Sequence, residues 1–159
     1  MPRTAPLIVL ILSAAVVGGA LVAQYWGGLR PCELCLYERW PYDAAIALAA
    51  IAFVLGRRGI SRAALILAGL IFVASAVLAF YHVGVEQHWF AGPTACTATT
   101  LHAGSVEALR QQLLATPTVR CDEIQWSVFD LDPLVDGNFV MSLILIAVSW
   151  RLAARLGKR

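Results

Sequence analysis

Four cysteines, Cys32, Cys35, Cys96 and Cys121, are the residues of this chain whose type and spacing suggest chemistry. Cys32 and Cys35 form a C-x-x-C motif, in which two sulfurs lie close enough to exchange between dithiol and disulfide and one thiol pKa is commonly lowered. Cys96 and Cys121 lie 25 positions apart, so a disulfide that braces a loop is a sufficient interpretation of that pair alone. The first pair therefore indicates thiol-disulfide chemistry.

The composition indicates that these cysteines belong to a membrane protein. Of the 159 residues, 60% are apolar and only 14% are charged, and the mean hydropathy is +0.74. A soluble domain of this size leaves about 30% of its surface in water, which is too much for so apolar a chain. The net charge of +2 provides no clustered basic face for nucleic acid. We expect one all-α membrane domain over residues 1–159.

Uncharged runs predict four membrane-spanning helices. Two runs are long enough to cross about 30 Å of hydrocarbon unaided, whereas two shorter ones, 44–56 and 137–150, must recruit preceding residues. A cleaved signal peptide is the alternative for the first run, although such peptides usually have only about 7–15 apolar residues. The expected spans are 7–26, 37–56, 63–85 and 133–152.

Local patterns refine the expected helices. Asp132 is a candidate N-cap of the last helix, with Pro133 as its first residue and Asp136 in its first turn. Gly69 and Ser75 are small residues suited to helix packing in the third span. The spacing of apolar residues predicts a short helix over Ser105–Ala115, lying on the membrane or solvated in its loop.

The charges predict the orientation of the bundle. Eight of the twelve basic residues gather in three clusters, and all ten acidic residues lie between these clusters. Because Lys and Arg accumulate in short cytoplasmic loops, we expect both termini in the cytoplasm and periplasmic loops at 27–36 and 86–132. The clusters comprise Arg3, then Arg57, Arg58 and Arg62, and finally Arg151, Arg155, Lys158 and Arg159.

This topology places all four cysteines outside the membrane, in the periplasm of a bacterial cell. Disulfides persist in that oxidising compartment, so an even number of cysteines favours two disulfides. Four cysteines allow three pairings, and spacing alone does not choose among them.

Arg39 is the candidate charged partner of the C-x-x-C motif. It lies one helical turn beyond Cys35 and keeps its proton in practice, so an anion such as a thiolate or a reduced quinone is its expected neighbour. The alternative is an interface residue paired with Glu38, Asp43 or a lipid phosphate. Glu33, inside the motif, disfavours thiolate formation.

The segment from Pro31 to Arg39, PCELCLYER, resembles the signature of the DsbB family, membrane oxidases that reoxidise DsbA. Less specific similarities occur in the segments YHVGVE (81–86), GPTAC (92–96) and CDEIQW (121–126). Together with the four expected spans, they extend the resemblance over most of the chain. The resemblance implies a four-helix protein-dithiol:quinone oxidoreductase of the bacterial inner membrane, with a periplasmic DsbA-like partner.

The resemblance also implies roles for individual residues. Cys96 would accept attack by the reduced partner, after which Cys121 would become linked to Cys32. Cys35 would donate electrons to ubiquinone or menaquinone, Arg39 would stabilise the resulting negative charge, and His82 is a candidate neighbour of the quinone. Because a DsbA disulfide is itself strongly oxidising, at about −120 mV, the terminal acceptor must be more oxidising still.

The sequence is also compatible with two other functions. A non-catalytic assembly or scaffold protein would use its two disulfides only to brace the outer face. An enzyme that passes electrons outward would need an electron-rich donor. Redox titration with a dithiol partner and a quinone distinguishes both from the oxidase.

We expect no metal cofactor. A zinc site made of the four cysteines is disfavoured, because structural sites usually bring ligands in close pairs and Cys96 and Cys121 are not one. A haem held by His82 and His88 is disfavoured because only His82 lies within an expected span, and His102 is expected at the surface. Five tryptophans are expected to form an interfacial belt: Trp26, Trp40, Trp89, Trp126 and Trp150.

Overall fold

The computed structural model describes residues 2–93, 105–115, 119–124, 126 and 134–158, and this part of the chain contains helices and no strands. The prediction of an all-α protein is confirmed for these residues. The helices are α1 (Thr4–Tyr25), α2 (Glu33–Tyr37), α3 (Arg39–Leu55), α4 (Arg58–Glu86), α5 (Val106–Ala115) and α6 (Val135–Gly157).

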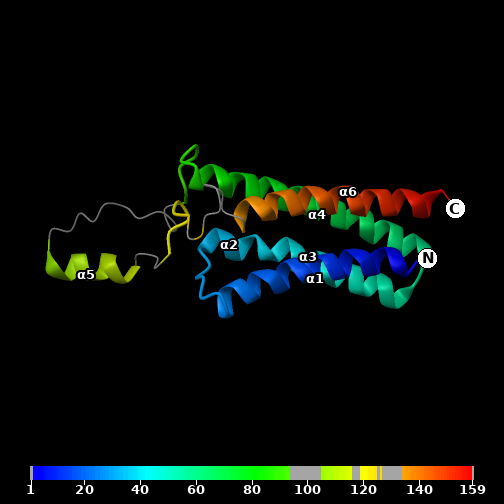
Figure 1. Cartoon of the computed structure of the whole chain (residues 1–159), viewed down its shortest axis with the longest axis horizontal. Helices are drawn as coiled ribbons and strands as arrows, with labels where there is room; N and C mark the ends of the chain where they lie inside the picture. The colour runs from blue at the N-terminus through cyan, green and yellow to red at the C-terminus, as the bar shows by residue number, and fades with distance from the viewer. Residues whose placement is uncertain (1, 94–104, 116–118, 125, 127–133, 159) are drawn as a thin grey trace.

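Four of these helices, α1, α3, α4 and α6, run along one another in an elongated bundle, and α5 lies apart from them (Figure 1). Within the described residues, α1, α4 and α6 are long and apolar enough to cross a membrane, which supports a multi-pass membrane protein. The shorter α3 has 17 residues and follows α2 after a single residue, Glu38.

Small residues bring the long helices together. The most extensive contact joins α4 to α6, where the Trp150 indole covers the backbone of Gly69 and the Ser142 hydroxyl donates to Ser75 Oγ at 3.0 Å. Both predicted packing residues of the third span are therefore at a helix interface. The bundle core includes Val9, Tyr42, Ala45, Ala49, Leu65, Phe72 and Leu145. Large apolar side chains also cover the outside, as a lipid-facing surface requires: Ile11, Val54, Leu70, Val77 and Val140.

The basic clusters converge at one end of the bundle, where both termini also lie (Figure 1). Gly56 ends α3 in the left-handed conformation, with φ of 62°, and an added Cβ there would lie 2.5 Å from the Arg3 guanidinium. Arg58 Nε donates to the carbonyl oxygen of Leu156 at 2.6 Å. Three basic segments that are distant in sequence are thus neighbours in space.

Two of the local predictions are confirmed. The short helix predicted over Ser105–Ala115 is α5, and Ser105 Oγ accepts a hydrogen bond from the backbone N–H of Ala108 at 3.2 Å. Asp136 lies in the first turn of α6, as expected. In the described residues α6 has Leu134 at its N-cap, without a side-chain hydrogen bond.

Val135, the first residue of α6, is buried, so the first turn of this helix is packed against the bundle. Asp132 and Pro133 themselves lie outside the described residues.

Candidate functional site

The C-x-x-C motif lies at the start of α2. Cys32 is the N-cap residue, with an extended backbone, and its Sγ accepts a hydrogen bond from the backbone N–H of Cys35 at 3.1 Å. The two sulfur atoms lie 2.6 Å apart. Cys32 is buried and Cys35 is partly exposed. The first turn of α2 therefore holds both sulfurs together at the free N–H groups of a helix start.

The two thiols are not equivalent. Hydrogen bonds with Cys121 and with Cys35, together with burial, raise the pKa of the Cys32 thiol above its ordinary value. The hydrogen bond from Cys32 lowers the pKa of Cys35, against the opposing effect of burial. Cys35 is therefore the sulfur that carries negative charge more readily, and a thiolate is the reactive form of cysteine.

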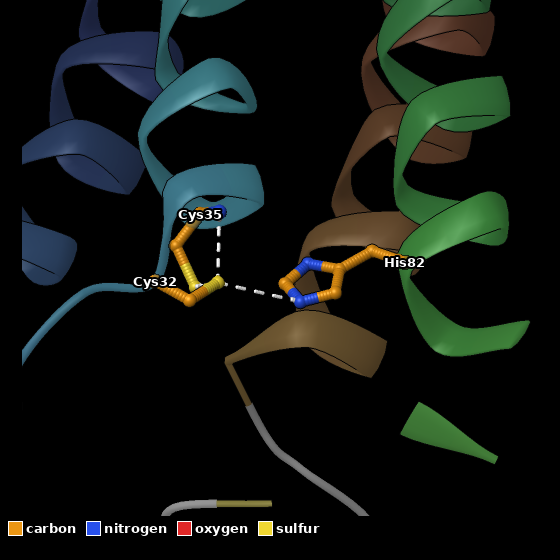
Figure 2. Close-up of side chains that lie close together, drawn as sticks. All are labelled: Cys32, Cys35 and His82. Carbon is orange, nitrogen blue, oxygen red and sulfur yellow. Dashed lines mark hydrogen bonds between the residues drawn. The ribbon is translucent and has the colours of Figure 1, made fainter. Parts of the chain in front are cut away.

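His82 of α4 faces the cysteine pair (Figure 2). The ring is buried, with Nε2 3.5 Å from Cys32 Sγ and Nδ1 2.8 Å from Glu38 Oε1. Glu86, one turn along α4, has its Oε1 3.8 Å from the same Nε2. The structure thus holds His82 between a carboxylate and a thiol.

Sequence reasoning missed the network that holds Glu38. The side-chain amide of Asn138, on α6, donates to Glu38 Oε2 at 2.8 Å, and Tyr42 donates its hydroxyl to Asn138 Oδ1 at 2.6 Å. Tyr42 Oη also lies 3.0 Å from Ser142 Oγ. A continuous hydrogen-bonded chain thus runs from the bundle interior to the imidazole beside Cys32. In the sequence this network is visible only as a few polar residues inside apolar helices, which is a weak indication of a shared site.

Cys121 also lies at this site. It is buried and packs in one cluster with Cys32, Leu34 and Val85. The preceding residue, Arg120, holds Asp122 through two hydrogen bonds of 2.9 and 2.6 Å, which lower the pKa of the Asp122 carboxyl. This clamp shapes the turn that presents Cys121.

The structure therefore brings three of the four cysteines together. Cys96 lies outside the described residues, as does His102. His88 lies beyond the end of α4, where its Nδ1 is 2.8 Å from the carbonyl oxygen of Glu86.

A cavity of about 320 Å³ opens beside the cysteine pair. One wall is formed by small and apolar residues of α1, including Val16, Gly19 and Ala20, and an added Cβ at Gly19 would meet no atom within 4 Å. The polar wall contains Cys35 and His82. This volume lies within the roughly 300–1,000 Å³ typical of small-molecule sites.

Arg39 also lines the cavity. Its Nη1 donates to Gln24 Oε1 of α1 at 2.8 Å, so in the described part of the chain the guanidinium is hydrogen-bonded to a neutral amide. The alternative pairing with Glu38 or Asp43 is not found among the described residues, where Glu38 is directed to His82 and Asn138. The positive charge of Arg39 is thus left to face the cavity.

Comparison with known proteins places this site in a family. A family model described as "Disulfide bond formation protein DsbB" matches residues 2–152. Two proteins of Haemophilus influenzae named "Disulfide bond formation protein B" are similar: that of strain Rd is 27% identical and that of strain 86-028NP is 26% identical, each over 151 residues covering 92% of this chain and 83% of the relative.

An uncharacterized protein of Rickettsia prowazekii (strain Madrid E) is 24% identical over 143 residues, which cover 88% of this chain and 81% of that protein. No solved structure gives a significant match. The family match extends over nearly the whole chain and includes the helices that hold the cysteine pair, His82 and Arg39. The chain therefore belongs to the DsbB family of disulfide bond formation proteins.

Proposed function

We propose that this chain is a protein-dithiol:quinone oxidoreductase, which reoxidises a periplasmic DsbA-like protein and passes the electrons to membrane quinone. The observation that carries the proposal is the cavity, which has an apolar wall on α1 and, on its polar wall, the C-x-x-C sulfurs and Arg39. A lipid-soluble acceptor and a sulfur donor meet most readily at such a boundary between apolar and polar surroundings.

The proposed reaction balances over two thiol-disulfide exchanges and one quinone reduction. A thiolate of the reduced partner attacks Cys96 in a disulfide with Cys121, and the partner's second thiol then releases the partner as a disulfide. Cys121, freed as a thiolate, attacks its neighbour Cys32 in a Cys32–Cys35 disulfide and releases Cys35 as a thiolate. Cys96, freed when the partner leaves, then attacks Cys121, which re-forms the Cys96–Cys121 disulfide and leaves Cys32 and Cys35 as a dithiol. Oxidation of Cys32 and Cys35 to a disulfide then yields two electrons and two protons, which a quinone accepts to become a quinol.

The residues around the cavity suit such an acceptor. Small residues of α1 leave room beside the sulfurs, and the guanidinium of Arg39 stabilises negative charge that develops on the reduced ring. Cys35 is the sulfur best suited to donate, since its pKa is the lower of the two. The imidazole of His82, backed by Glu38, lies where it accepts the proton of the Cys32 thiol.

The proposed topology has four spans, with both termini and the turn at Gly56 in the cytoplasm of the inner membrane. The convergence of Arg3, Arg58 and Arg62 at the end that holds both termini supports this orientation. The cysteines then face the periplasm, where a DsbA-like partner is available.

The test is a coupled assay with full-length protein in detergent, a reduced DsbA-like protein, and ubiquinone or menaquinone supplied separately. We expect one partner disulfide for each quinol formed. Cys35→Ser should abolish quinol formation, whereas His88→Gln, a change outside the cavity lining, should leave it intact.

Absence of both partner oxidation and quinol formation would favour the scaffold alternative. Reduction of the oxidised partner by quinol, in preference to the forward reaction, would indicate an enzyme that passes electrons outward.

A further inference from the structure

Cys32, Cys35 and His82 together present three metal-ligand atoms, all within 4.8 Å of one another. We propose that the dithiol form of this site binds one thiophilic divalent cation of the Zn²⁺ class through these three residues. The site differs from the four-cysteine zinc site considered in the sequence, because His82 comes from α4 and is 50 positions from Cys32.

The distances suit a tetrahedral ion. With Zn–S bonds of about 2.3 Å and Zn–N bonds of about 2.0–2.1 Å, adjacent ligand atoms in a tetrahedron lie roughly 3.5–3.8 Å apart. Cys32 Sγ and His82 Nε2 are 3.5 Å apart. The sulfur pair, at 2.6 Å, must open by about 1 Å for such a tetrahedron, and Cys35 has room to move because it is partly exposed.

The surroundings of His82 are those of a metal-ligating histidine. Glu38 Oε1 lies 2.8 Å from Nδ1 and requires a proton there, so in the neutral ring the lone pair of Nε2 points toward the sulfurs. A carboxylate that holds the second nitrogen fixes the tautomer and raises the basicity of the ligating one. Asn138 holds the other oxygen of Glu38, which keeps this carboxylate in place.

The fourth position is left to a solvent oxygen, as in zinc sites that keep one coordination position open. Each thiol that binds releases its proton to solvent, and the charge of the cation compensates the two thiolates. This compensation favours binding in a site shielded from water.

Metal and disulfide exclude one another, because both need the same two sulfurs. The bound ion therefore arrests the cysteine pair in its reduced form, and a chelator releases it. The site rests on geometry alone and stands whether or not the proposed quinone reaction is correct.

The test titrates full-length protein in detergent, reduced anaerobically with a phosphine. The Cys96→Ser/Cys121→Ser background leaves only two thiols. Cadmium is followed by its sulfur-to-metal charge-transfer absorbance, and zinc by competition with a chromophoric chelator. We expect one ion per chain in the dithiol form and none after oxidation with diamide.

Variants assign the ligands. His82→Gln and Cys32→Ser each remove a ligand and should weaken binding by about 100-fold or more. Glu38→Gln keeps all three ligands and changes the hydrogen-bond partner of His82 Nδ1, so it should weaken binding by about 10- to 100-fold. His88→Gln is the matched control and should bind as the parent does. Binding that survives oxidation, or is unchanged in His82→Gln, would overturn the proposal.

X-ray absorption of zinc-loaded protein in which no ligand is substituted identifies the atoms bound to zinc, even if a variant does not fold. Two sulfur ligands and at least one imidazole nitrogen are expected, and a shell of oxygen and nitrogen alone would contradict the assignment. The quinone assay, run in the presence of a chelator, reports the proposed function separately.

Discussion

At the scale of single residues, the site depends on the difference between two neighbouring thiols. Cys32 is the buried N-cap residue, and the partly exposed Cys35 has its Sγ 2.6 Å from Cys32 Sγ. Because the hydrogen bond between these sulfurs lowers the pKa of Cys35 and raises that of Cys32, one contact assigns the two sulfurs different chemistry.

This difference predicts the alkylation behaviour of the reduced protein. Cys35 should react with iodoacetamide at a lower pH than Cys32, because only the thiolate reacts and a lower pKa leaves more thiolate at neutral pH. Cys32→Ala removes the hydrogen-bond donor, so the pKa of Cys35 should rise toward its ordinary value. Each rise of one in pKa lowers the thiolate fraction about tenfold at pH 7.

The measurement is the pH dependence of alkylation at each cysteine, resolved by peptide mass. Cys32→Ser is the control, since its hydroxyl still donates and should preserve part of the effect. If Cys35 in Cys32→Ala titrates as in the parent, the hydrogen bond is not the cause of its low pKa.

At the scale of helices, α6 completes the site from the opposite side of the bundle. Asn138 joins Glu38 to Tyr42, so α6, which carries no cysteine, helps to orient the carboxylate behind His82. The packing of α6 on α4, with Trp150 against Gly69, sets the position from which the Asn138 side chain contacts Glu38.

Replacement of Asn138 should therefore impair both stability and turnover. Asn138→Leu removes one hydrogen-bond partner from Glu38 and one from Tyr42, which keep His82 and Ser142 respectively, so we expect a loss of about 1–3 kcal/mol. The thermal midpoint measures the first effect, and the pH profile of turnover at a temperature where the variant is folded measures the second.

Val140→Leu, on the exposed face of the same helix, serves as the control and should change neither quantity. Loss of stability in Asn138→Leu with an unchanged pH profile would show that Asn138 has only a structural role.

Gly69 provides a second prediction at this scale. A Cβ at this position would collide with the indole of Trp150, so Gly69→Ala should destabilise the bundle by about 1–3 kcal/mol. Gly69→Ala combined with Trp150→Leu should cost less than the sum of the two single changes. Gly18→Ala, where an added Cβ meets nothing within 4 Å, should be neutral or slightly stabilising.

Chemical denaturation in a single detergent measures all four variants. Strict additivity of the Gly69 and Trp150 changes would mean that the two residues are not energetically coupled.

At the scale of the whole molecule, the bundle has two chemically different ends. One end holds both termini and the converging arginines, and the other holds α2 and the start of α6 (Figure 1), with Cys32, Cys35 and Cys121. Such separation of the basic clusters from these three cysteines suits a protein whose two ends face different compartments.

The orientation is tested by reporter fusions. Green fluorescent protein fused after Lys158 should fluoresce, and alkaline phosphatase at the same position should be inactive, because the C-terminus is expected in the cytoplasm. Phosphatase inserted before Ser105 should be active, since that loop is expected in the periplasm. Active phosphatase at the C-terminus would reverse the topology and place the cysteines in the wrong compartment.

Short-range patterns in the sequence were sufficient for the helices and for part of the site. The uncharged runs predict the positions of the long helices, and the C-x-x-C spacing predicts two neighbouring sulfurs, because both depend on residues a few positions apart. The helix after Ser105 was predictable for the same reason.

Only the tertiary structure decided which side chains meet. Glu38 and His82 are 44 positions apart, Glu38 and Asn138 are 100 apart, and Arg39 bonds to Gln24 in place of the acidic neighbours that its sequence suggests. Such pairs depend on how each helix is rotated about its axis and shifted along it. Hydrophobic runs leave both quantities open, because an apolar helix is compatible with lipid and with its neighbours on almost any face.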